Sequence, residues 1–426
     1  MAGSRHNAGV STEAVPAEAS TGFDVRPYEG DARAFLNAVE VPFAFTPRDE
    51  DFQLFEPLIE LDRALAAYDG GRVVGTAGIF SMGLTVPGGE LPMAGVTMVS
   101  VHPTHRRRGL LREMMRQQLE AIHRRHEPLA GLWASEGAIY QRFGYGMATL
   151  AARFEIERAR SAFRETPAPT GSLRLVDADA AARLFPPVFE KVRAMRAGVY
   201  DRPEAWWRSE FFHDPEHQRN GGSPATYVVH ETDGMADAYA RYRLHPEWDE
   251  RGPKYALEVL EAMATTPEAT AELWRYLLDV DLVATIRGRN LPIDHPLLLL
   301  LAEPRRLGWG VGDALWLRVV DLVAALEGRG WAADGRIVLE VRDETCPWNA
   351  GRWELSAEGG GGRVTATTRS ADLALHVRDL GAAYLGGVGM SQLHSAGRIA
   401  ELTPGAADRA DAMLRTAFAP WCPTIF

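Results

Sequence analysis

Cysteine is scarce in this chain of 426 residues, where only Cys346 and Cys422 occur. Two cysteines can pair only once, which excludes the disulfide framework that holds many small secreted domains together. Long apolar runs are also missing. The densest run, residues 296–302, is far shorter than the roughly 20 residues of a membrane-spanning helix. Residues 1–20 lack the apolar core of a signal peptide. We therefore expect a cytoplasmic protein with no membrane partner.

Lysine is equally scarce, with Lys191 and Lys254 alone, and acidic residues outnumber basic ones to give a net charge of −11. This sign disfavours nucleic acids as partners and favours cationic small molecules such as polyamines. The chain is 46% hydrophobic and 24% charged, as is typical of globular proteins. At about 150 residues per domain, its length predicts roughly three domains.

Hydrophobic periodicity and turn signals divide the chain into segments of α/β (α+β) character. Residues 1–21 are small and polar, which predicts a disordered leader. The later segments are a first α/β domain over 22–155, a second over 156–306 and an α+β domain over 307–426. Among their elements we expect a helix over 31–39, strands over 72–80 and 89–101, a helix over 319–327 and a last helix over 406–418.

Residues 97–115 combine a strand, an Arg-Gly turn and an amphipathic helix. Arg106, Arg107 and Arg108 precede Gly109, at which the helix is expected to begin. Free N–H groups at a helix N-terminus, together with three guanidinium groups, would bind a pyrophosphate. A solvated surface run of arginines is the alternative for this segment alone. The second domain contains no such turn.

A second string, residues 133–145, contains Tyr140 on a short predicted helix before Gly144 and Tyr145. Together the two strings resemble the GNAT acetyltransferases, in which an Arg/Gly turn binds acetyl-CoA and a later helix carries a tyrosine. Leu111 stands where most GNAT proteins have a small residue. That replacement, the strings 103–112, 134–146 and 315–329, and the terminal Phe426 resemble the Eis (enhanced intracellular survival) family of N-acetyltransferases.

The resemblance covers nearly the whole chain and implies two tandem GNAT-like domains followed by a domain that is similar to sterol carrier proteins. It implies acetyl-CoA as cosubstrate, no metal, and a homo-oligomer, which the resemblance makes a hexamer. The second domain would lack the CoA motif, and the tail of the third would dock in the active site. The residues expected to contact acetyl-CoA are Val99, Ser100, Val101, Arg106, Arg107, Arg108, Gly109, Leu110, Leu111 and Ser135.

Two residues are predicted to move protons. Tyr140 resembles the family's general acid. The chemistry suits this role, because a phenol of pKa near 10 is protonated at neutral pH and can donate to a departing thiolate. A purely structural core tyrosine is the alternative. By the same resemblance, the terminal carboxylate of Phe426 would act as the base through water, whereas a frayed end is the default for a terminus. Ser135 would hydrogen-bond the cofactor or Tyr140, or cap the helix that carries Tyr140.

The candidate substrate residues are Glu40, Phe43, Phe45 and Met98, since aromatic walls with a carboxylate suit cationic amines. Packing in the core is the alternative for the two phenylalanines. Ile425 replaces an acidic residue that several relatives carry before the terminal Phe, which weakens the expectation of aminoglycoside binding. The histidines lack the partners of a zinc site. Acetylation of protein or peptide lysine, and a non-catalytic acyl-CoA or lipid-binding module, are the competing functions.

Overall fold

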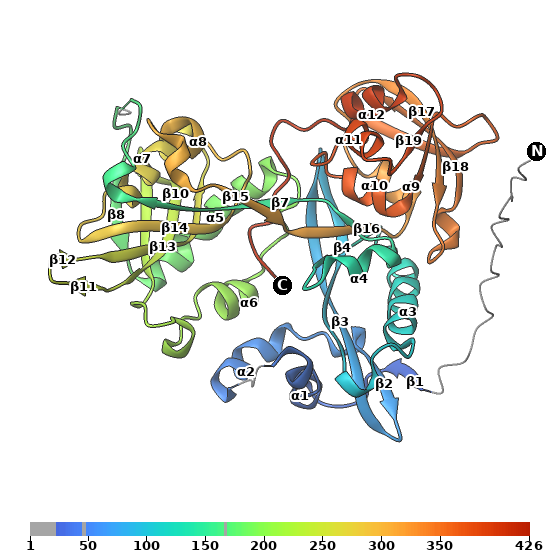
Figure 1. Cartoon of the computed structure of the whole chain (residues 1–426), viewed down its shortest axis with the longest axis horizontal. Coiled ribbons are helices and arrows are strands. Elements are labelled where there is room, and N and C mark those ends of the chain that lie inside the picture. The colour runs from blue at the N-terminus through green and yellow to red at the C-terminus, as the bar shows by residue number, and fades with distance from the viewer. Residues whose placement is uncertain (1–22, 45–47, 166–167) are drawn as a thin grey trace, which may run out of the picture.

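The computed structural model describes residues 23–44, 48–165 and 168–426 (Figure 1). The expected leader, 1–21, lies outside the described residues. The described chain forms three units, each built on one sheet with helices against it. Within these ranges no helix is long and apolar enough to cross a membrane. We name the units first, second and third in the order in which the chain begins them.

The first unit is a seven-stranded sheet. In spatial order its strands are β1 (Asp24–Pro27), β2 (Leu65–Asp69), β3 (Arg72–Val86), β4 (Gly89–Val101), β5 (Leu129–Trp133), β16 (Leu315–Val319) and β6 (Gly146–Met147). Its helices are α1 (Ala32–Phe43), α2 (Asp49–Phe55), α3 (Leu110–Arg124) and α4 (Gly137–Tyr140). The strands predicted over 72–80 and 89–101 and the helix predicted from Asp31 are therefore present.

Local sequence explains the helices of this unit. Asp31 caps α1, because its side chain accepts a hydrogen bond from the backbone N–H of Ala34 at 2.7 Å. α3 is amphipathic, and its buried face consists of Leu110, Met114, Met115, Gln118, Leu119 and Ile122. That face packs with Ile79 and other side chains on one side of the sheet, while Phe80 and its neighbours face the opposite side. The alternation of β3 thus gives the sheet two apolar faces.

The second unit repeats this architecture with another seven-stranded sheet. In spatial order its strands are β15 (Gly310–Asp313), β7 (Leu150–Glu157), β14 (Val283–Leu291), β13 (Tyr255–Ala264), β10 (Met235–His245), β9 (Thr226–Thr232) and β8 (Ser172–Val176). Its helices include α5 (Ala178–Met195), α6 (Glu204–Trp206), α7 (Pro267–Leu278) and α8 (Leu297–Leu300), and β11 (Trp248–Asp249) pairs with β12 (Gly252–Pro253).

The third unit is a five-stranded sheet covered by helices, as Figure 1 shows in orange and red. Its strands are β19 (Gly361–Ala366), β18 (Gly351–Glu358), β17 (Gly335–Arg342), β20 (Leu373–His376) and β21 (Ala400–Glu401). Its helices are α9 (Leu322–Glu327), α10 (Val377–Ala383), α11 (Met390–Ser395) and α12 (Ala406–Leu414). The α+β class predicted for this part of the chain is confirmed.

The sheets do not follow the expected domain limits. β7, over Leu150–Glu157, was expected to end the first domain but pairs with β14 in the second sheet. Conversely, β16 was expected to belong to the third domain but lies between β5 and β6 in the first sheet. The second sheet also contains β15, over Gly310–Asp313, from the predicted third domain. The first and second sheets therefore receive strands from beyond their predicted boundaries, because ladder hydrogen bonding and not sequence order decides membership.

Two predicted helices have different limits. The helix expected over 319–327 begins only at Leu322, since Leu315–Val319 is the strand β16. Asp321 caps it by accepting a hydrogen bond from Ala324 N–H at 3.0 Å. The last helix ends at Leu414 and not at residue 418, and an extended tail follows.

A buried ion pair fastens the first sheet to the third unit. Arg318 of β16 is fully buried, and its Nη2 donates to both carboxylate oxygens of Asp343 at 2.7 Å. Asp343 also accepts from Asn349 Nδ2 at 3.0 Å. Around this pair, one continuous apolar core contains side chains of all three units, including Leu84, Trp206 and Leu339.

The tail after α12 runs back between the first and second units, and the C-terminus lies between them in Figure 1. Arg196 donates to the carbonyl of Ala419 at 2.8 Å, and Ala419 N–H donates to Asp294 at 2.8 Å. Further on, Arg202 donates to the hydroxyl of Thr424 at 2.8 Å. The tail is therefore held by side chains of the second unit.

Trp421 holds the tail by burial and by two hydrogen bonds. It is 5% exposed, its backbone N–H donates to Ala197 at 2.8 Å, and its ring N–H donates to the carbonyl of Asn290 at 2.6 Å. Asn290 in turn donates to the carbonyl of Pro423 at 3.3 Å. The parallel ladder between β13 and β14 ends before this point, at Val259 and Gly288. The tail thus lies where these two strands have separated.

Removing one charge of the buried pair should destabilise the protein strongly. We expect Asp343→Asn to cost about 3–5 kcal/mol, because it leaves the Arg318 guanidinium buried without a counter-charge. Denaturant unfolding midpoints measure this. Glu340→Gln is the matched control, since its exposed pair with Arg352 (2.8 Å) should contribute less than about 1 kcal/mol. Equal losses in both variants would contradict a special role for the buried pair.

Loosening the tail should expose a thiol. Cys422 is fully buried and burial raises its pKa to about 12, so its thiol is protonated and unreactive. Trp421→Ala should release the tail and accelerate modification of one thiol by Ellman's reagent by about tenfold or more. Adding Cys422→Ser should abolish the gain, because Cys346 stays buried in the core. Unchanged reactivity in Trp421→Ala would show that the tail is held without this ring.

Candidate active site

The first sheet is split where β4 and β5 separate. Their parallel ladder includes Met93, Ala94 and Gly95 and ends at the pair Gly95 and Gly131. Both strands continue beyond it, β4 to Val101 and β5 to Trp133. The backbone of β4 after Gly95 is therefore free to pair with an extended ligand on its β5 side. We call this separation the first fork.

A bulge in β4 shapes the fork. Thr76 pairs with Ser100 and Gly78 pairs with Thr97, so two residues of β4 oppose one of β3. Met98 at the bulge has a φ of 50°, which is uncommon for a side chain of its size. The hydroxyl of Thr76 fixes it by donating to the carbonyl of Met98 at 2.8 Å.

The bulge also decides how the predicted strand residues point. Ser100 is 4% exposed, and its Oγ lies 2.8 Å from the hydroxyl of Thr76. Its side chain is therefore engaged inside the sheet, and only its backbone is left for a cofactor. Val99 and Val101 both pack against the core beside α3, and Val99 also lines the cavity described below.

The turn before α3 is built for close approach to its backbone. Arg107 and Gly109 have positive φ values of 64° and 86°, and the helix begins at Gly109 without a side-chain cap. The first N–H groups of α3 consequently have no side-chain acceptor. Arg106 and Arg108 are exposed, and the guanidinium of Arg108 lies 5.4 Å from the centre of the Phe23 ring. This arrangement suits an anion.

The two leucines after the turn have packing roles as well. Leu110 is 1% exposed and belongs to the buried face of α3, and Leu111 packs against the same core. Their side chains therefore cannot reach a bound anion, and any contact with it is made by their backbone N–H groups.

In the second unit, α7 corresponds to α3, and its N-terminus is capped. Thr266 caps α7 by accepting from Ala269 N–H at 3.1 Å, and Pro267 removes a further donor from its first turn. Trp421 and Pro423 occupy the space between β13 and β14, where a cavity of 20 Å³ remains, and a second cavity of 270 Å³ shares Glu261, Asn290 and Pro423 with it. In the second unit the helix terminus is thus capped, and the tail lies between the separated strands.

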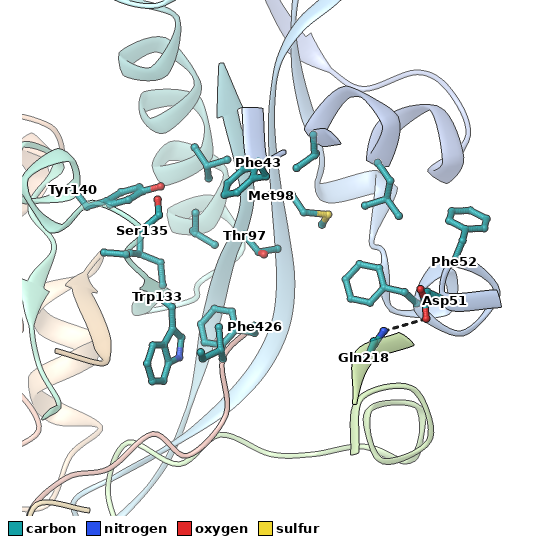
Figure 2. Close-up of a pocket in the computed structure, with 18 residues that line it drawn as sticks. Phe43, Asp51, Phe52, Thr97, Met98, Trp133, Ser135, Tyr140, Gln218 and Phe426 are labelled. Atoms are coloured by element: carbon teal, nitrogen blue, oxygen red, sulfur yellow. Dashed lines mark hydrogen bonds between the residues drawn. The ribbon is translucent and has the colours of Figure 1, made fainter. Parts of the chain in front are cut away.

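A cavity of 730 Å³ occupies the first fork and extends to α1 and α2 (Figure 2). It is large enough for a small-molecule substrate. The described residues that line it are Leu36, Val39, Phe43, Asp51, Phe52, Phe55, Val96, Thr97, Met98, Val99, Leu132, Trp133, Ala134, Ser135, Tyr140, Gln218, Ile425 and Phe426.

Tyr140 stands at one end of this cavity. It is 7% exposed, and its ring packs edge-on against Tyr145 with centres 6.1 Å apart. Burial, and to a lesser degree the charge of Glu136, raises the pKa of Tyr140 above its ordinary value of 10. Ser135 points into the cavity beside it in Figure 2. It does not cap α4, whose N-cap is Glu136 without a side-chain hydrogen bond.

Phe426 reaches the middle of the same cavity (Figure 2). Its ring packs edge-on against Tyr200 with centres 5.4 Å apart and lies against Gly95, where a Cβ atom would come within 3.2 Å of it. A Cβ atom there would come still closer to Met82, at 2.7 Å from its sulfur, so the absence of a side chain at Gly95 makes room for both Met82 and Phe426. Trp133 and Phe426 form adjacent walls in the close-up.

Of the predicted substrate residues, Phe43 and Met98 line the cavity. Phe43 is 47% exposed, so the alternative of burial in the core is wrong for it. Glu40 is absent from the lining. Phe45 lies outside the described residues.

Asp51 is a lining residue that sequence reasoning missed. It lies on α2 at the end of the cavity opposite Tyr140 in Figure 2. The second unit supplies its partners: His213 Nε2 at 2.9 Å, His217 Nε2 at 2.8 Å and Gln218 Nε2 at 3.0 Å. Burial raises the pKa of Asp51, but the hydrogen bonds with the two histidines outweigh it and hold the pKa below its ordinary value. Asp51 is therefore ionised at neutral pH.

Comparison with known proteins agrees with this geometry. Residues 25–148 and residues 198–319 each match a family described as an acetyltransferase (GNAT) domain, and residues 322–423 match a sterol carrier protein domain. The predicted order of two GNAT-type domains and a sterol-carrier-like domain is confirmed. The match to 198–319 ends at the last residue of β16. The sequence of the second GNAT domain therefore includes a strand that pairs in the first sheet.

Relatives cover most of the chain. An uncharacterized N-acetyltransferase of Streptomyces avermitilis is 45% identical over 88% of this chain and 92% of its own length. The N-acetyltransferase Eis of Mycobacterium tuberculosis is 36% identical over 82% of this chain and 86% of its own length. The crystal structure of Eis1 from Mycobacterium abscessus is 35% identical, has a TM-score of 0.81, and covers 95% of this chain and all of its own. The chain therefore belongs to the Eis family of GNAT N-acetyltransferases.

Proposed function

We propose that this enzyme acetylates primary amines of cationic small molecules, such as polyamines or aminoglycosides, in the cytoplasm. The observation that carries the proposal is one cavity, in the first fork, that is lined by Tyr140 at one end and Phe426 in the middle. A proton donor and a potential base thus share one space. The net charge of −11 also favours cationic acceptors.

The residues of the fork fit acetyl-CoA. The unpaired backbone of β4 at Val99, Ser100 and Val101 would hold the extended pantetheine arm. The N–H groups after Gly109 and the guanidinium groups of Arg106, Arg107 and Arg108 would hold the pyrophosphate. Ser135 would contact the arm from the β5 side. When bound there, acetyl-CoA supplies the acetyl group as a thioester.

Proton transfer is assigned to Phe426 and Tyr140. The carboxylate of Phe426 accepts a proton from the substrate ammonium through water, which frees the nitrogen lone pair. The nitrogen then forms the new N–C bond as the C–S bond breaks, and the hydroxyl of Tyr140 donates its proton to the sulfur. The acetylated nitrogen loses its surplus proton to water, and Tyr140 regains a proton from water. Because burial raises the pKa of Tyr140, the phenol stays protonated and ready to donate at neutral pH.

We further propose that the active assembly is a homo-oligomer, a hexamer by the family resemblance. Peptide lysine is the alternative acceptor. The discriminating experiment measures thiol release from acetyl-CoA with polyamines, aminoglycosides and lysine peptides, and weighs the products by mass spectrometry. Acetylated small amines would support the proposal. Exclusive acetylation of peptides would favour the alternative, and binding of acetyl-CoA without any product would leave only the non-catalytic acyl-CoA module.

Removing the Tyr140 hydroxyl should slow the chemical step. Tyr140→Phe should lower kcat about 100-fold, the usual contribution of a general acid, with the KM for acetyl-CoA changed less than about threefold. Tyr145→Phe is the matched control, because the Tyr145 hydroxyl is buried without a hydrogen-bond partner and lies outside the cavity lining. In the unsubstituted enzyme, the raised pKa of Tyr140 predicts no loss of kcat from its ionisation below about pH 10. Equal activity of the two variants would refute the assignment.

Deleting Phe426 should move the terminal carboxylate away from the amine. We expect kcat to fall by about 100-fold, because Ile425 then ends the chain outside the position of the proposed base. Phe426→Leu keeps a carboxylate at the same position and should retain most of kcat. Steady-state kinetics with one amine distinguish the two variants, and full activity after the deletion would rule out the carboxylate as base.

A further inference from the structure

The cavity is apolar over most of its length. The lining side chains other than Tyr140 and Asp51 are largely aliphatic and aromatic, among them Val39, Met98 and Phe55. Among the described lining residues Asp51 is the one charged side chain, and Phe426 adds the terminal carboxylate. A ligand that spans the cavity therefore meets the hydroxyl of Tyr140 at one end, Phe426 with its terminal carboxylate in the middle, apolar walls, and the carboxylate of Asp51 at the far end.

Asp51 retains room for one more donor. An ionised carboxylate has about four acceptor positions, and three of these receive His213, His217 and Gln218. The side chain of Asp51 is 24% exposed, and the residue lines the cavity, so the remaining position can be reached from there. The three donors hold the carboxylate in place, which lowers the entropy cost of binding a further N–H group.

The surroundings of Asp51 are acidic as well. His217 lies between two carboxylates, with Nε2 2.8 Å from Asp51 and Nδ1 3.3 Å from Glu50. The neighbouring Asp49 also lies in the first turn of α2. Asp49 pairs with Arg33 at 2.9 Å and Glu50 lies 3.9 Å from Arg48, so of these three acidic residues it is Asp51 that presents its carboxylate to the cavity.

We propose that Asp51 is the specificity-determining residue for a second, distal ammonium group, and that the preferred acceptors are diamines whose two nitrogens are joined by an apolar chain. The inference rests on the proposed function, because one nitrogen must be acetylated near Tyr140 while the other binds Asp51. The N–C bond forms and the C–S bond breaks at the first nitrogen only. Asp51 takes no part in that step.

The same walls select against polyhydroxylated amines. Hydroxyl groups facing Val39, Met98 and Phe55 would lose their water without gaining a hydrogen-bond partner. Each methylene placed there instead gains by burial, by about fourfold in affinity. Alkyl diamines are therefore expected to exceed aminoglycosides in kcat/KM.

The test compares n-octylamine with the linear α,ω-diamines of four to ten carbons, and kanamycin as a polyhydroxylated amine. Wild-type enzyme should show kcat/KM rising with diamine length, and 1,8-diaminooctane should exceed n-octylamine by about thirtyfold, the value of one charge-assisted contact. Asp51→Asn should lower the diamine value to that of the monoamine and change the monoamine by less than about twofold.

Glu204→Gln is the matched control. It removes one carboxylate that is exposed, paired with Arg208 at 2.7 Å and absent from the cavity lining, so the diamine-to-monoamine ratio should stay within about twofold of wild type. If Asp51→Asn lowers turnover of both amines equally, or if kanamycin exceeds every diamine, the inference is wrong although amine acetylation stands.

Calorimetric titration of the two eight-carbon amines in the presence of CoA separates this inference from the proposed function. Diamine binding that weakens about thirtyfold in Asp51→Asn supports the distal site even if no amine is turned over, in which case only the proposed function fails. Equal affinity for both amines in wild type overturns the distal site. Circular dichroism of the variant verifies that it is folded.

Discussion

The hydrogen-bond ladder between β4 and β5 ends at Gly95 and Gly131, and the position of the cavity, of Tyr140 and of the chain end all depend on that interruption. The bulge at Met98 turns β4 away from β5, and the free helix terminus after Gly109 follows directly. A continuous ladder would satisfy every backbone group internally and leave no space for a ligand. The catalytic capacity of this domain is therefore a local defect in sheet pairing, stabilised by the surrounding core.

The two GNAT domains share this defect and resolve it differently. In the first, the separation of the strands is open and forms a large cavity. In the second, Trp421 and Pro423 fill the separation, Asn290 hydrogen-bonds the tail, and Thr266 closes the helix terminus. One domain thus keeps a ligand site while the other has become a receptor for the chain's own tail. The receptor matters for the first domain, because it places Phe426 in its cavity.

Sequence reasoning found what is encoded by contiguous residues. The turn at Gly109 and the helix of Tyr140 are local strings, and the class and order of the three domains followed from them. It missed β16, because a short apolar run before a helix has no periodicity that separates strand from helix. It also missed Asp51, whose role as a lining residue depends on histidines more than 160 residues away. An aspartate and two histidines so far apart in the sequence do not predict a site, because only the fold brings them together.

The exchange of strands has a consequence for biosynthesis. The first sheet begins with β1 at Asp24 but is completed only by β16, which ends at Val319, and the whole second unit is translated in between. An emerging chain must therefore keep the edge of β5 unpaired until most of the polypeptide has been made. Such long-range pairing slows folding and exposes a strand edge to misassembly. The first sheet is consequently complete only when the chain has reached Val319, and a fragment that ends before β16 lacks one of its strands.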